Sequence, residues 1–337
     1  MEFIVSIAIL QLGLLLFIAA ALLLYLICRI PSDEDHGRSG SSPGSGKTVL
    51  VTSCDCAIGL QLAFHLANSG FRVFAGLKTA SEAGCPEDSV PAKAIRAWQK
   101  YRESEQELGN ITVIHLDVTR EDLLYESVDV IRAHLPAGQD GSFSAIKGSD
   151  FVTSCLMFFA GIWAVVCTNG ITFRGSLAQQ EISHWDTILK TNIVGVLRTA
   201  RTFQNLLKNS GGRILTIGTS DNMGGGLVAY AASRYGVEGA SDALRQELSP
   251  FGIKVVTINP VGIMPELLFA QPKFIKNPET DDVCITINGL LNYQPRVLTE
   301  RALDILDIAL IAKEPKSHYK LKCTYKWWHR LPLMSYI

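Results

Sequence analysis

The stretch that decides the fold runs Thr48-Val49-Leu50-Val51-Thr52-Ser53-Cys54-Asp55-Cys56-Ala57-Ile58-Gly59. Its first five residues are β-branched or apolar, which is typical of a strand buried in a parallel sheet. A turn of small and polar residues follows. The apolar pattern over Leu60–Ser69 then predicts a helix that ends at Gly70. The stretch therefore predicts the first strand–turn–helix unit of an α/β domain.

The same alternation of strand and helix patterns continues along the chain. Further strands are predicted over Phe71–Leu77, Ile111–Leu116, Ile162–Cys167, Arg213–Ile217 and Lys254–Ile258. Helices are predicted over Ala92–Leu108, Glu121–Leu135, Trp185–Leu207, Tyr230–Leu248 and Leu298–Ala312. This rhythm indicates parallel βαβ units, and so a Rossmann-type, doubly wound parallel sheet. Ligands bind such sheets at the carboxyl ends of the strands.

Composition limits the classes of function. The 337 residues carry a net charge of -1, so no basic field indicates a nucleic-acid partner. The eight cysteines form no CxxC pair, which argues against a zinc site and against a disulfide framework. We therefore predict no metal site and a reducing compartment.

The N-terminal segment Phe3–Cys28 is almost entirely apolar. About 20 such residues cross a bilayer as a helix, and Glu2 stands where a signal peptide would carry basic residues. We therefore predict a transmembrane anchor over residues 1–29, a flexible linker over 30–46 and a catalytic domain over 47–337.

Basic residues indicate the orientation of that anchor. Arg29, Arg38 and Lys47 all follow the apolar segment, which favours a cytosolic body under the positive-inside rule. The interpretation is a single-pass protein of the endoplasmic reticulum membrane that faces the cytosol. A mitochondrial membrane is the less favoured alternative.

Two regions have no clear assignment from pattern alone. Residues 137–160 form a Gly- and Ser-rich insertion, which fits either a membrane or partner contact or buried filler. The C-terminal region 263–337 ends in Lys326–Met334, where adjacent aromatic residues stand among basic ones. That composition suits a contact with lipid headgroups and a lid over a substrate pocket equally well.

The residues Tyr230 and Arg234 are four apart in a predicted helix, so they share one face. A free tyrosine titrates near ~10, and a neighbouring cation lowers the pKa of its phenol. The pair therefore fits an acid/base centre. Such spacing occurs by chance on many helices, so its weight comes from the motifs that precede it.

Taken together, these motifs resemble the classical short-chain dehydrogenase/reductase family over about residues 47–265. The similarity is strongest to the membrane-associated steroid, retinol and hydroxybutyrate dehydrogenases. It is carried by Cys54-Asp55 after the first strand, by Val73–Gly76 in the second, and by the aromatic-basic tail. The family's Tyr-x-x-x-Lys centre corresponds to Tyr230 and Arg234.

The resemblance implies a role for each matching residue. Tyr230 would be the general acid/base, and Arg234 the cation that lowers its pKa. Thr219 would hold the substrate carbonyl, with Ser220 as the alternative, and Asn192 would place a relay water. The implied cofactor-binding residues are Thr52, Ser53, Asp55, Ala57, Ile58, Gly59, Asp117, Val118, Asn169, Gly170, Arg234 and Pro260.

Several positions depart from the family pattern. Ser53 and Ala57 replace glycines of the turn, and each added Cβ costs about 1 kcal/mol if φ is positive there. The family's Asn-Asn-Ala-Gly has become Cys167–Gly170, and the gap from Thr219 to Tyr230 is shorter than usual. Arg234 keeps the charge of the family lysine, but its planar fork sits differently.

The resemblance leads to two hypotheses. The first is a membrane-anchored oxidoreductase that uses NAD or NADP and acts on a lipophilic steroid, sterol (as in ecdysteroid synthesis) or retinoid, with a homodimer expected. The alternative is a catalytically impaired relative that binds nucleotide or sterol, or acts as a scaffold. Lys78 ends the second strand, where an acid would favour NAD. A solvated lysine is preferred there over one that meets a 2′-phosphate.

Overall fold

The computed structural model describes residues 11, 44–78, 89–103, 110–135, 161–221, 223–274, 293–294 and 296–323. The chain divides into two units, Met1–Ser41 and Ser42–Ile337. The predicted anchor (apart from Gln11), most of the predicted linker, the insertion over 137–160 and the tail over 326–334 lie outside the described residues. Among the residues that are described, none belongs to a helix with the length and apolarity needed to cross a membrane.

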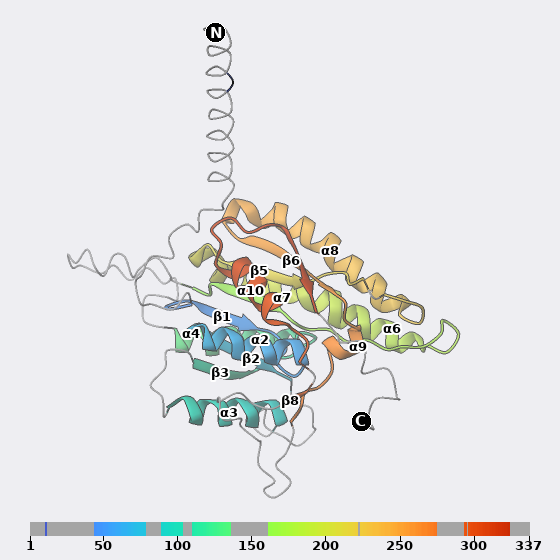
Figure 1. The fold of residues 1–337 in the computed structure, drawn as a ribbon, viewed down its shortest axis with the longest axis horizontal. Helices are drawn as coiled ribbons and strands as arrows, with labels where there is room; N and C mark the ends of the chain where they lie inside the picture. Colours follow the sequence, from blue (N-terminus) through green and yellow to red (C-terminus); the bar gives the residue numbers. More distant parts are fainter. Residues whose placement is uncertain are drawn as a thin grey trace, which may run out of the picture. The chain divides into compact units, whose positions relative to one another are not determined.

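A parallel sheet forms the centre of the second unit, in the order β3-β2-β1-β4-β5-β6-β9 (Figure 1). The strands are β1 (Thr48–Val51), β2 (Arg72–Leu77), β3 (Asn110–His115), β4 (Ala164–Cys167), β5 (Arg213–Ile217), β6 (Lys254–Val261) and β9 (His318–Lys322). A separate antiparallel pair joins β7 (Lys273–Phe274) and β8 (Tyr293–Gln294). The predicted Rossmann-type sheet is confirmed.

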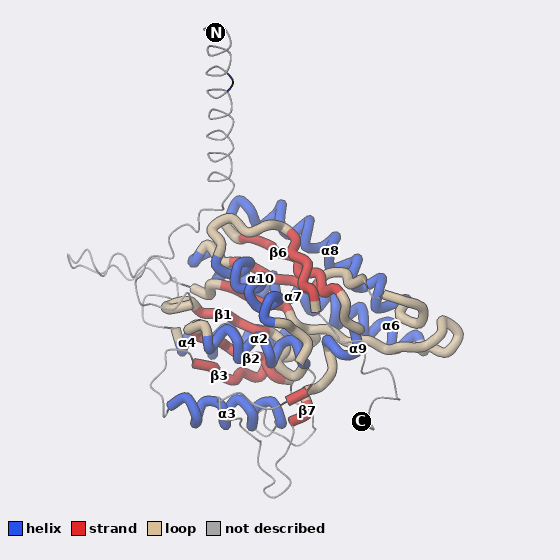
Figure 2. Tube along the Cα trace, viewed as in Figure 1, coloured by secondary structure: helices blue, strands red, loops and turns tan. Residues whose placement is uncertain are grey.

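Helices cover both faces of this sheet (Figure 2). They are α2 (Ala57–Asn68), α3 (Val90–Glu103), α4 (Glu121–His134), α6 (Ile182–Leu189), α7 (Gly195–Ser210), α8 (Val228–Leu248), α9 (Pro265–Leu268) and α10 (Glu300–Ile311). A π-helical turn, η3 (Lys190–Val194), joins α6 to α7, and a 3₁₀ turn, η4 (Ser249–Phe251), follows α8. One hydrophobic cluster contains side chains of α2, α3 and α10, and the other contains side chains of α4, α7 and α8.

Strand β1 shows why the sequence folds this way. Val49 and Val51 pack in the cluster of α2, whereas Leu50 packs in the cluster of α7, because successive strand side chains point to opposite faces. All three are fully buried. Burying such a side chain contributes about 1.5–3 kcal/mol relative to exposure, so both faces of the strand favour its central position.

The order of the strands creates the crevice in which a ligand can bind. β1 pairs with β2 on one side and with β4 on the other, so the chain winds outward in opposite directions from this point. Helices that leave β1 and β4 cover opposite faces, and a gap opens at the carboxyl ends of these two strands. The predicted turn after β1 lies at this gap.

The predicted single helix over Trp185–Leu207 is wrong in its details. The helical segment begins at Ile182 and is interrupted by the π turn η3 before α7 continues to Ser210. The buried side chain of Asn192 lies in this π turn, and its amide forms hydrogen bonds with the backbone N–H and the carbonyl of Ile171. Such widened turns occur often at functional sites.

Strand β9 was not predicted. It extends the sheet by pairing with β6, and its sequence, His-Tyr-Lys-Leu-Lys, buries Leu321 while its neighbours remain exposed or half-buried. The charged side chains of this short edge strand replace the apolar run by which a strand is recognised in a sequence. They also discourage pairing with other chains.

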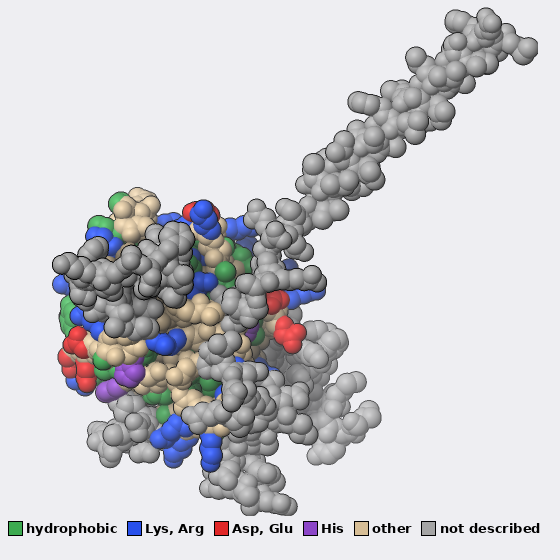
Figure 3. All heavy atoms as spheres, turned by 90° about the vertical axis from the view of Figure 1, so that its left-hand side faces the viewer, with side chains coloured by type: hydrophobic (Ala, Val, Ile, Leu, Met, Phe, Trp, Pro, Cys, Tyr) green, Lys and Arg blue, Asp and Glu red, His purple; other side chains and the backbone are tan. Residues whose placement is uncertain are grey.

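The surface carries charges of both signs. On the face drawn in Figure 3, lysine and arginine side chains of the described residues lie interspersed with aspartate and glutamate side chains. This mixture agrees with the net charge of -1.

We predict that Gly59→Ala disrupts the start of α2. A Cβ at Gly59 would lie 1.8 Å from the carbonyl oxygen of Ser53, which is backbone and cannot rotate away. We expect a loss of about 3 kcal/mol in the free energy of unfolding, measured by urea denaturation. The matched control is Gly239→Ala in α8, where a Cβ meets nothing within 4 Å. It should stabilise by about 0.5–1 kcal/mol, and equal effects of the two changes would refute the packing argument.

Candidate functional site

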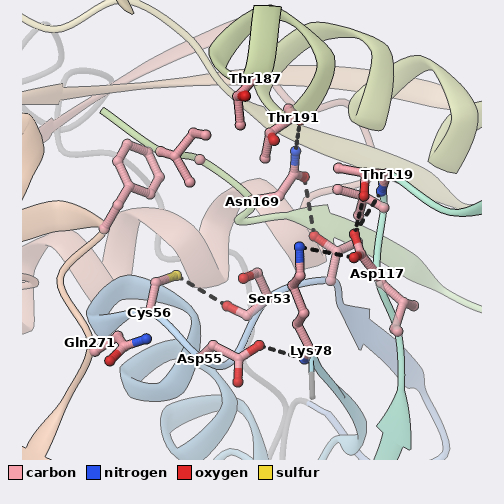
Figure 4. Close-up of a pocket in the computed structure, with 16 residues that line it drawn as sticks. Ser53, Asp55, Cys56, Lys78, Asp117, Thr119, Asn169, Thr187, Thr191 and Gln271 are labelled. Atoms are coloured by element: carbon pink, nitrogen blue, oxygen red, sulfur yellow. Dashed lines mark hydrogen bonds and ion pairs between the residues drawn. The ribbon is translucent and has the colours of Figure 1, made fainter. Parts of the chain in front are cut away.

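A cavity of about 450 Å³ lies at the carboxyl ends of β1, β2, β3 and β4 (Figure 4). Several predicted cofactor-binding residues line it, namely Thr52, Ser53, Asp55, Asp117, Val118, Asn169 and Gly170. The cavity therefore brings together side chains that come from four separate strand ends. Its position is the one expected for a ligand site in a doubly wound sheet.

Asp117 closes one side of the cavity just after β3. One carboxylate oxygen accepts hydrogen bonds from the backbone N–H and the hydroxyl of Thr119, at 2.8 and 2.7 Å. The other lies 2.9 Å from Nζ of Lys78. Burial alone would raise the pKa of Asp117, but the hydrogen bonds from Lys78 and Thr119 hold it below its usual value. Asp117 is therefore a fixed anion, paired with Lys78, whose own side chain is 60% exposed at the edge of the pocket (Figure 4).

Asp55 faces the same lysine from the turn after β1. Its carboxylate accepts a hydrogen bond from the backbone N–H of Lys78 at 2.6 Å. Burial nevertheless raises its pKa from 3.8 to about 6, because the Lys78 bond and charge only partly offset the loss of solvent. Nearby Asp117 adds to the rise by repulsion. Two carboxylates of the pocket thus have their pKa values pushed in opposite directions.

The floor of the pocket is a set of hydrogen bonds between the ends of β1 and β4. The hydroxyl of Thr168 accepts from the N–H of Ser53 at 3.1 Å and donates to the carbonyl of Ser53 at 3.0 Å. The hydroxyl of Thr52 lies 3.3 Å from Oδ1 of Asn169, whose amide nitrogen donates to the carbonyl of Thr191. The altered Cys167–Gly170 segment therefore still binds the turn after β1. Thr168 was not predicted as a site residue.

The start of α2 is occupied by the chain itself. The backbone N–H of Ala57 donates to the carbonyl oxygen of Ala270 at 2.8 Å. Ala57 is the first residue of α2, where φ is negative, so the strain expected from its Cβ does not arise. Ile58 and Gly59 are buried and do not line the cavity; Gly59 instead allows α2 to approach the carbonyl of Ser53.

Tyr230 and Arg234 lie together in α8, as the spacing predicts, and both are buried, with 1% and 0% exposure. Cζ of Arg234 lies 5.3 Å from the centre of the Tyr230 ring. Phe269 packs against both, with its ring 6.3 Å from that of Tyr230 and 4.9 Å from Cζ of Arg234. Phe269 and Gly170 line the cavity, so Tyr230 and Arg234 lie directly behind its wall.

The phenol has no hydrogen-bond partner among the described residues. Burial raises the pKa of Tyr230 above its usual value, while the charge of the nearby guanidinium pulls the pKa down by a smaller amount. The expectation of a lowered pKa is therefore wrong in its net direction, because loss of solvent outweighs the cation. Tyr230 is a neutral hydroxyl at neutral pH.

Asn192 is held rigidly in the π turn η3. Its amide nitrogen donates to the carbonyl of Ile171 at 3.1 Å and to the hydroxyl of Ser233 at 2.9 Å. Ser233 in turn donates to the carbonyl of Tyr230 at 2.7 Å. Asn192 therefore connects η3 to the turn of α8 that carries Tyr230.

The hydroxyl of Thr219 binds Glu238 and Asn259. Its hydroxyl donates to Oε1 of Glu238 at 2.6 Å and accepts from Nδ2 of Asn259 at 3.0 Å, and its own N–H also reaches Glu238. Glu238 is two turns beyond Tyr230 in α8. The hydroxyl proton of Thr219 is therefore engaged in a hydrogen bond to Glu238. The alternative, Ser220, is buried.

The last predicted residue, Pro260, is part of β6, where it pairs with Leu321 of β9 and does not line the cavity. Sequence reasoning missed Phe269 and Gln271, which line the pocket from the segment after α9. No local pattern marks these two residues, because only the return of the chain after β6 brings them to the ends of β1 and β4.

Comparisons with known proteins agree with this geometry. The short chain dehydrogenase family profile matches residues 145–272. D-beta-hydroxybutyrate dehydrogenase from Rattus norvegicus mitochondria is 26% identical over 94% of this chain and 88% of its own length. Human 17-beta-hydroxysteroid dehydrogenase type 2 is 27% identical over 78% of this chain and 57% of its own. Human retinol dehydrogenase 16 is 28% identical over 68% of this chain and 61% of its own length.

Solved structures share the fold. A metagenomic short-chain oxidoreductase in complex with NADP superposes with a TM-score of 0.55 at 17% identity, covering 84% of this chain and all of the other. An alcohol dehydrogenase from Thermococcus sibiricus, complexed with 5-hydroxy-NADP, gives a TM-score of 0.55 at 15% identity, over 83% of this chain and 97% of its own.

We predict that Asp55→Asn changes how stability depends on pH. Because the folded-state pKa of Asp55 is raised to about 6, its ionisation destabilises the native state as pH rises from about 4 through 6. Relative to the wild type, the variant should gain roughly 1–3 kcal/mol between pH 4.5 and pH 7 in urea unfolding. Asp117→Asn should show the opposite sign, because the pKa of Asp117 is lowered. Parallel pH curves for wild type and Asp55→Asn would contradict the assignment.

Proposed function

We propose that this chain is a short-chain dehydrogenase/reductase, and from that premise that it is an NAD(P)-dependent oxidoreductase acting on an alcohol or carbonyl group. The observation that carries the proposal is the neutral hydroxyl of Tyr230 beside the cation of Arg234, directly behind the wall of the pocket, with no hydrogen-bond partner found for it in the described part of the chain. When bound, the nicotinamide cofactor supplies or accepts the hydride.

Tyr230 would handle the proton. In reduction, the carbonyl carbon gains a hydride and the carbonyl oxygen gains a proton, and a neutral phenol can donate that proton. Arg234 would stabilise the phenolate that remains, since its charge already favours that form. Asn192 would hold the helix turn of Tyr230 in register through Ser233. Thr219 can hold a substrate carbonyl only if its hydroxyl exchanges Glu238 for the substrate.

The pocket fits a dinucleotide at its adenosine end. Asp117 and Val118 follow β3 where the family binds adenine, and Asp55 and Ser53 line the turn after β1. Lys78 offers a cation beside Asp117, which suits either a ribose or its 2′-phosphate. The fit at the diphosphate requires one change, because the N–H of Ala57 now binds the carbonyl of Ala270. A phosphate would take the place of that carbonyl.

We further propose a lipophilic substrate, namely a steroid or sterol (including an ecdysteroid precursor) or a retinoid. Relatives named as 17-beta-hydroxysteroid and retinol dehydrogenases support this class. The apolar segment Phe3–Cys28 supports an anchored protein of the endoplasmic reticulum membrane whose body faces the cytosol.

A second candidate function is that of a binding or scaffold protein without catalysis. It is favoured by the self-contact between Ala57 and Ala270 and by Phe269, which covers Tyr230. Both features come from one segment after α9. Turnover distinguishes the two candidates, because a catalytically impaired relative can bind the nucleotide without transferring a hydride.

The test is a titration of NADH and NADPH into the full chain in detergent, followed by cofactor fluorescence. We expect binding of at least one cofactor, weakened by Asp117→Ala. In a turnover screen of steroid and retinoid carbonyl compounds, Tyr230→Phe should retain cofactor binding but lose at least about 100-fold in kcat. The matched control is Tyr235→Phe, an exposed tyrosine in the same helix. A folded sample that binds neither cofactor would refute the proposed activity.

We also propose a homodimer formed by α7 and α8. Apolar side chains are exposed near this pair of helices, with Val194 and Leu197 38% and 39% exposed and Val228 and Tyr235 56% and 63% exposed. A stable interface buries about 800 Å² per partner, which a helix pair can supply.

We predict that Leu197→Glu combined with Tyr235→Glu yields a monomer, because two buried carboxylates on each side cannot be paired. Light scattering of the full chain in detergent measures the change. Ile308→Glu on α10, also exposed, should leave the dimer intact. A wild-type monomer, or dissociation by both changes, would contradict the proposed interface.

A further inference from the structure

The lysine that follows β2 contacts two carboxylates at the edge of the cavity (Figure 4). The backbone N–H of Lys78 donates to Oδ2 of Asp55 at 2.6 Å, and its ammonium lies 2.9 Å from Oδ2 of Asp117. Asp55 comes from the turn after β1, and Asp117 follows β3. All three residues line the cavity. The ends of three neighbouring strands thus bring two negative charges to one positive charge.

This part of the cavity has a net negative charge when both carboxylates are ionised. Among the described residues that line the cavity, Lys78 is the one basic residue, and Asp55 and Asp117 are the two acidic ones. The ammonium of Lys78 is already paired with Asp117. Arg120, close by after β3, is paired with Asp122 at 2.5 Å. An anionic ligand group would therefore meet cations that carboxylates already engage.

The position of these charges matters for a dinucleotide. In a doubly wound sheet, the diphosphate lies at the turn after the first strand, and the adenosine ribose lies near the end of the next strand. Here the next strand is β2, so the ribose would lie beside Lys78 and Asp55. Ribose hydroxyls donate hydrogen bonds, which a carboxylate accepts well. A 2′-phosphate carries a charge of about −1.5 to −2 and would be repelled by the same carboxylate.

We propose that Asp55 selects the cofactor, and that this chain binds NAD(H) in preference to NADP(H). The inference rests on the proposed oxidoreductase function and deepens it by choosing between the two cofactors. An acid that favours NAD usually stands at the end of β2. That place is taken by Lys78, and the acid comes instead from the turn after β1. Discrimination of this kind works by repelling the unwanted ligand as well as by binding the wanted one.

Protonation of Asp55 should weaken this discrimination. The titratable groups that face it, within the described part of the chain, are Lys78, Asp117 and the thiols of Cys54 and Cys56. Burial raises the pKa of Asp55 to about 6. The pKa of Asp117 is lowered and those of both thiols are raised, so these three groups keep their charge states near neutral pH. The repulsion from Asp55 is therefore lost as pH falls through about 6.

The experiment uses the full chain in detergent and two probes, ADP-ribose and ADP-ribose with a 2′-phosphate on its adenosine ribose. Calorimetric titration gives both Kd values, and their ratio cancels the competing contact between Ala57 and Ala270, which both probes must open. At pH 7.5 we expect ADP-ribose to bind at least about tenfold more tightly. Asp55→Asn should reduce the ratio at least about tenfold, chiefly because the 2′-phosphate probe binds more tightly. Asparagine can still accept the N–H of Lys78, so the variant should keep its fold.

A change from pH 7.5 to pH 5.5 should narrow the ratio more in the wild type than in Asp55→Asn. The 2′-phosphate itself titrates near ~6, and the variant measures that share of the pH dependence. The matched control is Asp129→Asn in α4, which removes an exposed carboxylate that does not line the cavity. It makes the same change in net charge and should leave the ratio within about twofold of the wild type.

Three results would overturn the proposal. They are equal or tighter binding of the 2′-phosphate probe at pH 7.5, a ratio that Asp55→Asn leaves unchanged, and an equal change of the ratio in Asp129→Asn. Turnover with NADH and NADPH on the same sample separates this failure from failure of the proposed activity. A chain that uses both cofactors equally well remains an oxidoreductase without the selectivity, whereas a folded chain that binds neither probe loses both proposals.

Discussion

The burial of β1 on both faces is the constraint on which the rest of this structure depends. Because its side chains are packed from either side and its backbone is paired with two neighbours, only its carboxyl end remains open. The chain must leave the sheet there, at the point where the winding direction reverses. The polar groups of Asp55, Asp117 and Asn169 gather at that edge.

The pKa values of the ionisable groups in and behind the pocket are set by two opposing effects, the loss of solvent and the attraction of neighbouring charges. At Tyr230 the loss of solvent prevails and the phenol stays protonated, although a guanidinium lies beside it. At Asp117 the lysine and the threonine prevail and the carboxylate stays ionised. Asp55 lies between these cases, with a pKa of about 6. The same pocket thus holds groups in different protonation states near neutral pH.

Much of this arrangement could be predicted from the sequence, because local patterns determine it. The strand runs and the helix periodicity lead to the sheet without its edge strand β9, and the spacing of Tyr230 and Arg234 places the two side chains together. The hydrogen bonds of Asn192 in the π turn could not be predicted, since they reach the backbone of Ile171, far away in the sequence. The partners of Thr219 and the position of Phe269 likewise depend on contacts between distant segments. The sign of the pKa shift at Tyr230 depends on burial, which a helix spacing does not reveal.

The contact between the Ala57 N–H and the Ala270 carbonyl gives the chain an internal competitor. Any anion that needs this N–H must first displace a carbonyl that is covalently attached and always present. The affinity observed in a titration is then the intrinsic affinity multiplied by the fraction of molecules in which the contact is open. Each ~1.4 kcal/mol by which the closed form is favoured weakens the measured binding about tenfold. A relative with a different residue after α9 can therefore differ in affinity without any change in the residues that touch its ligand.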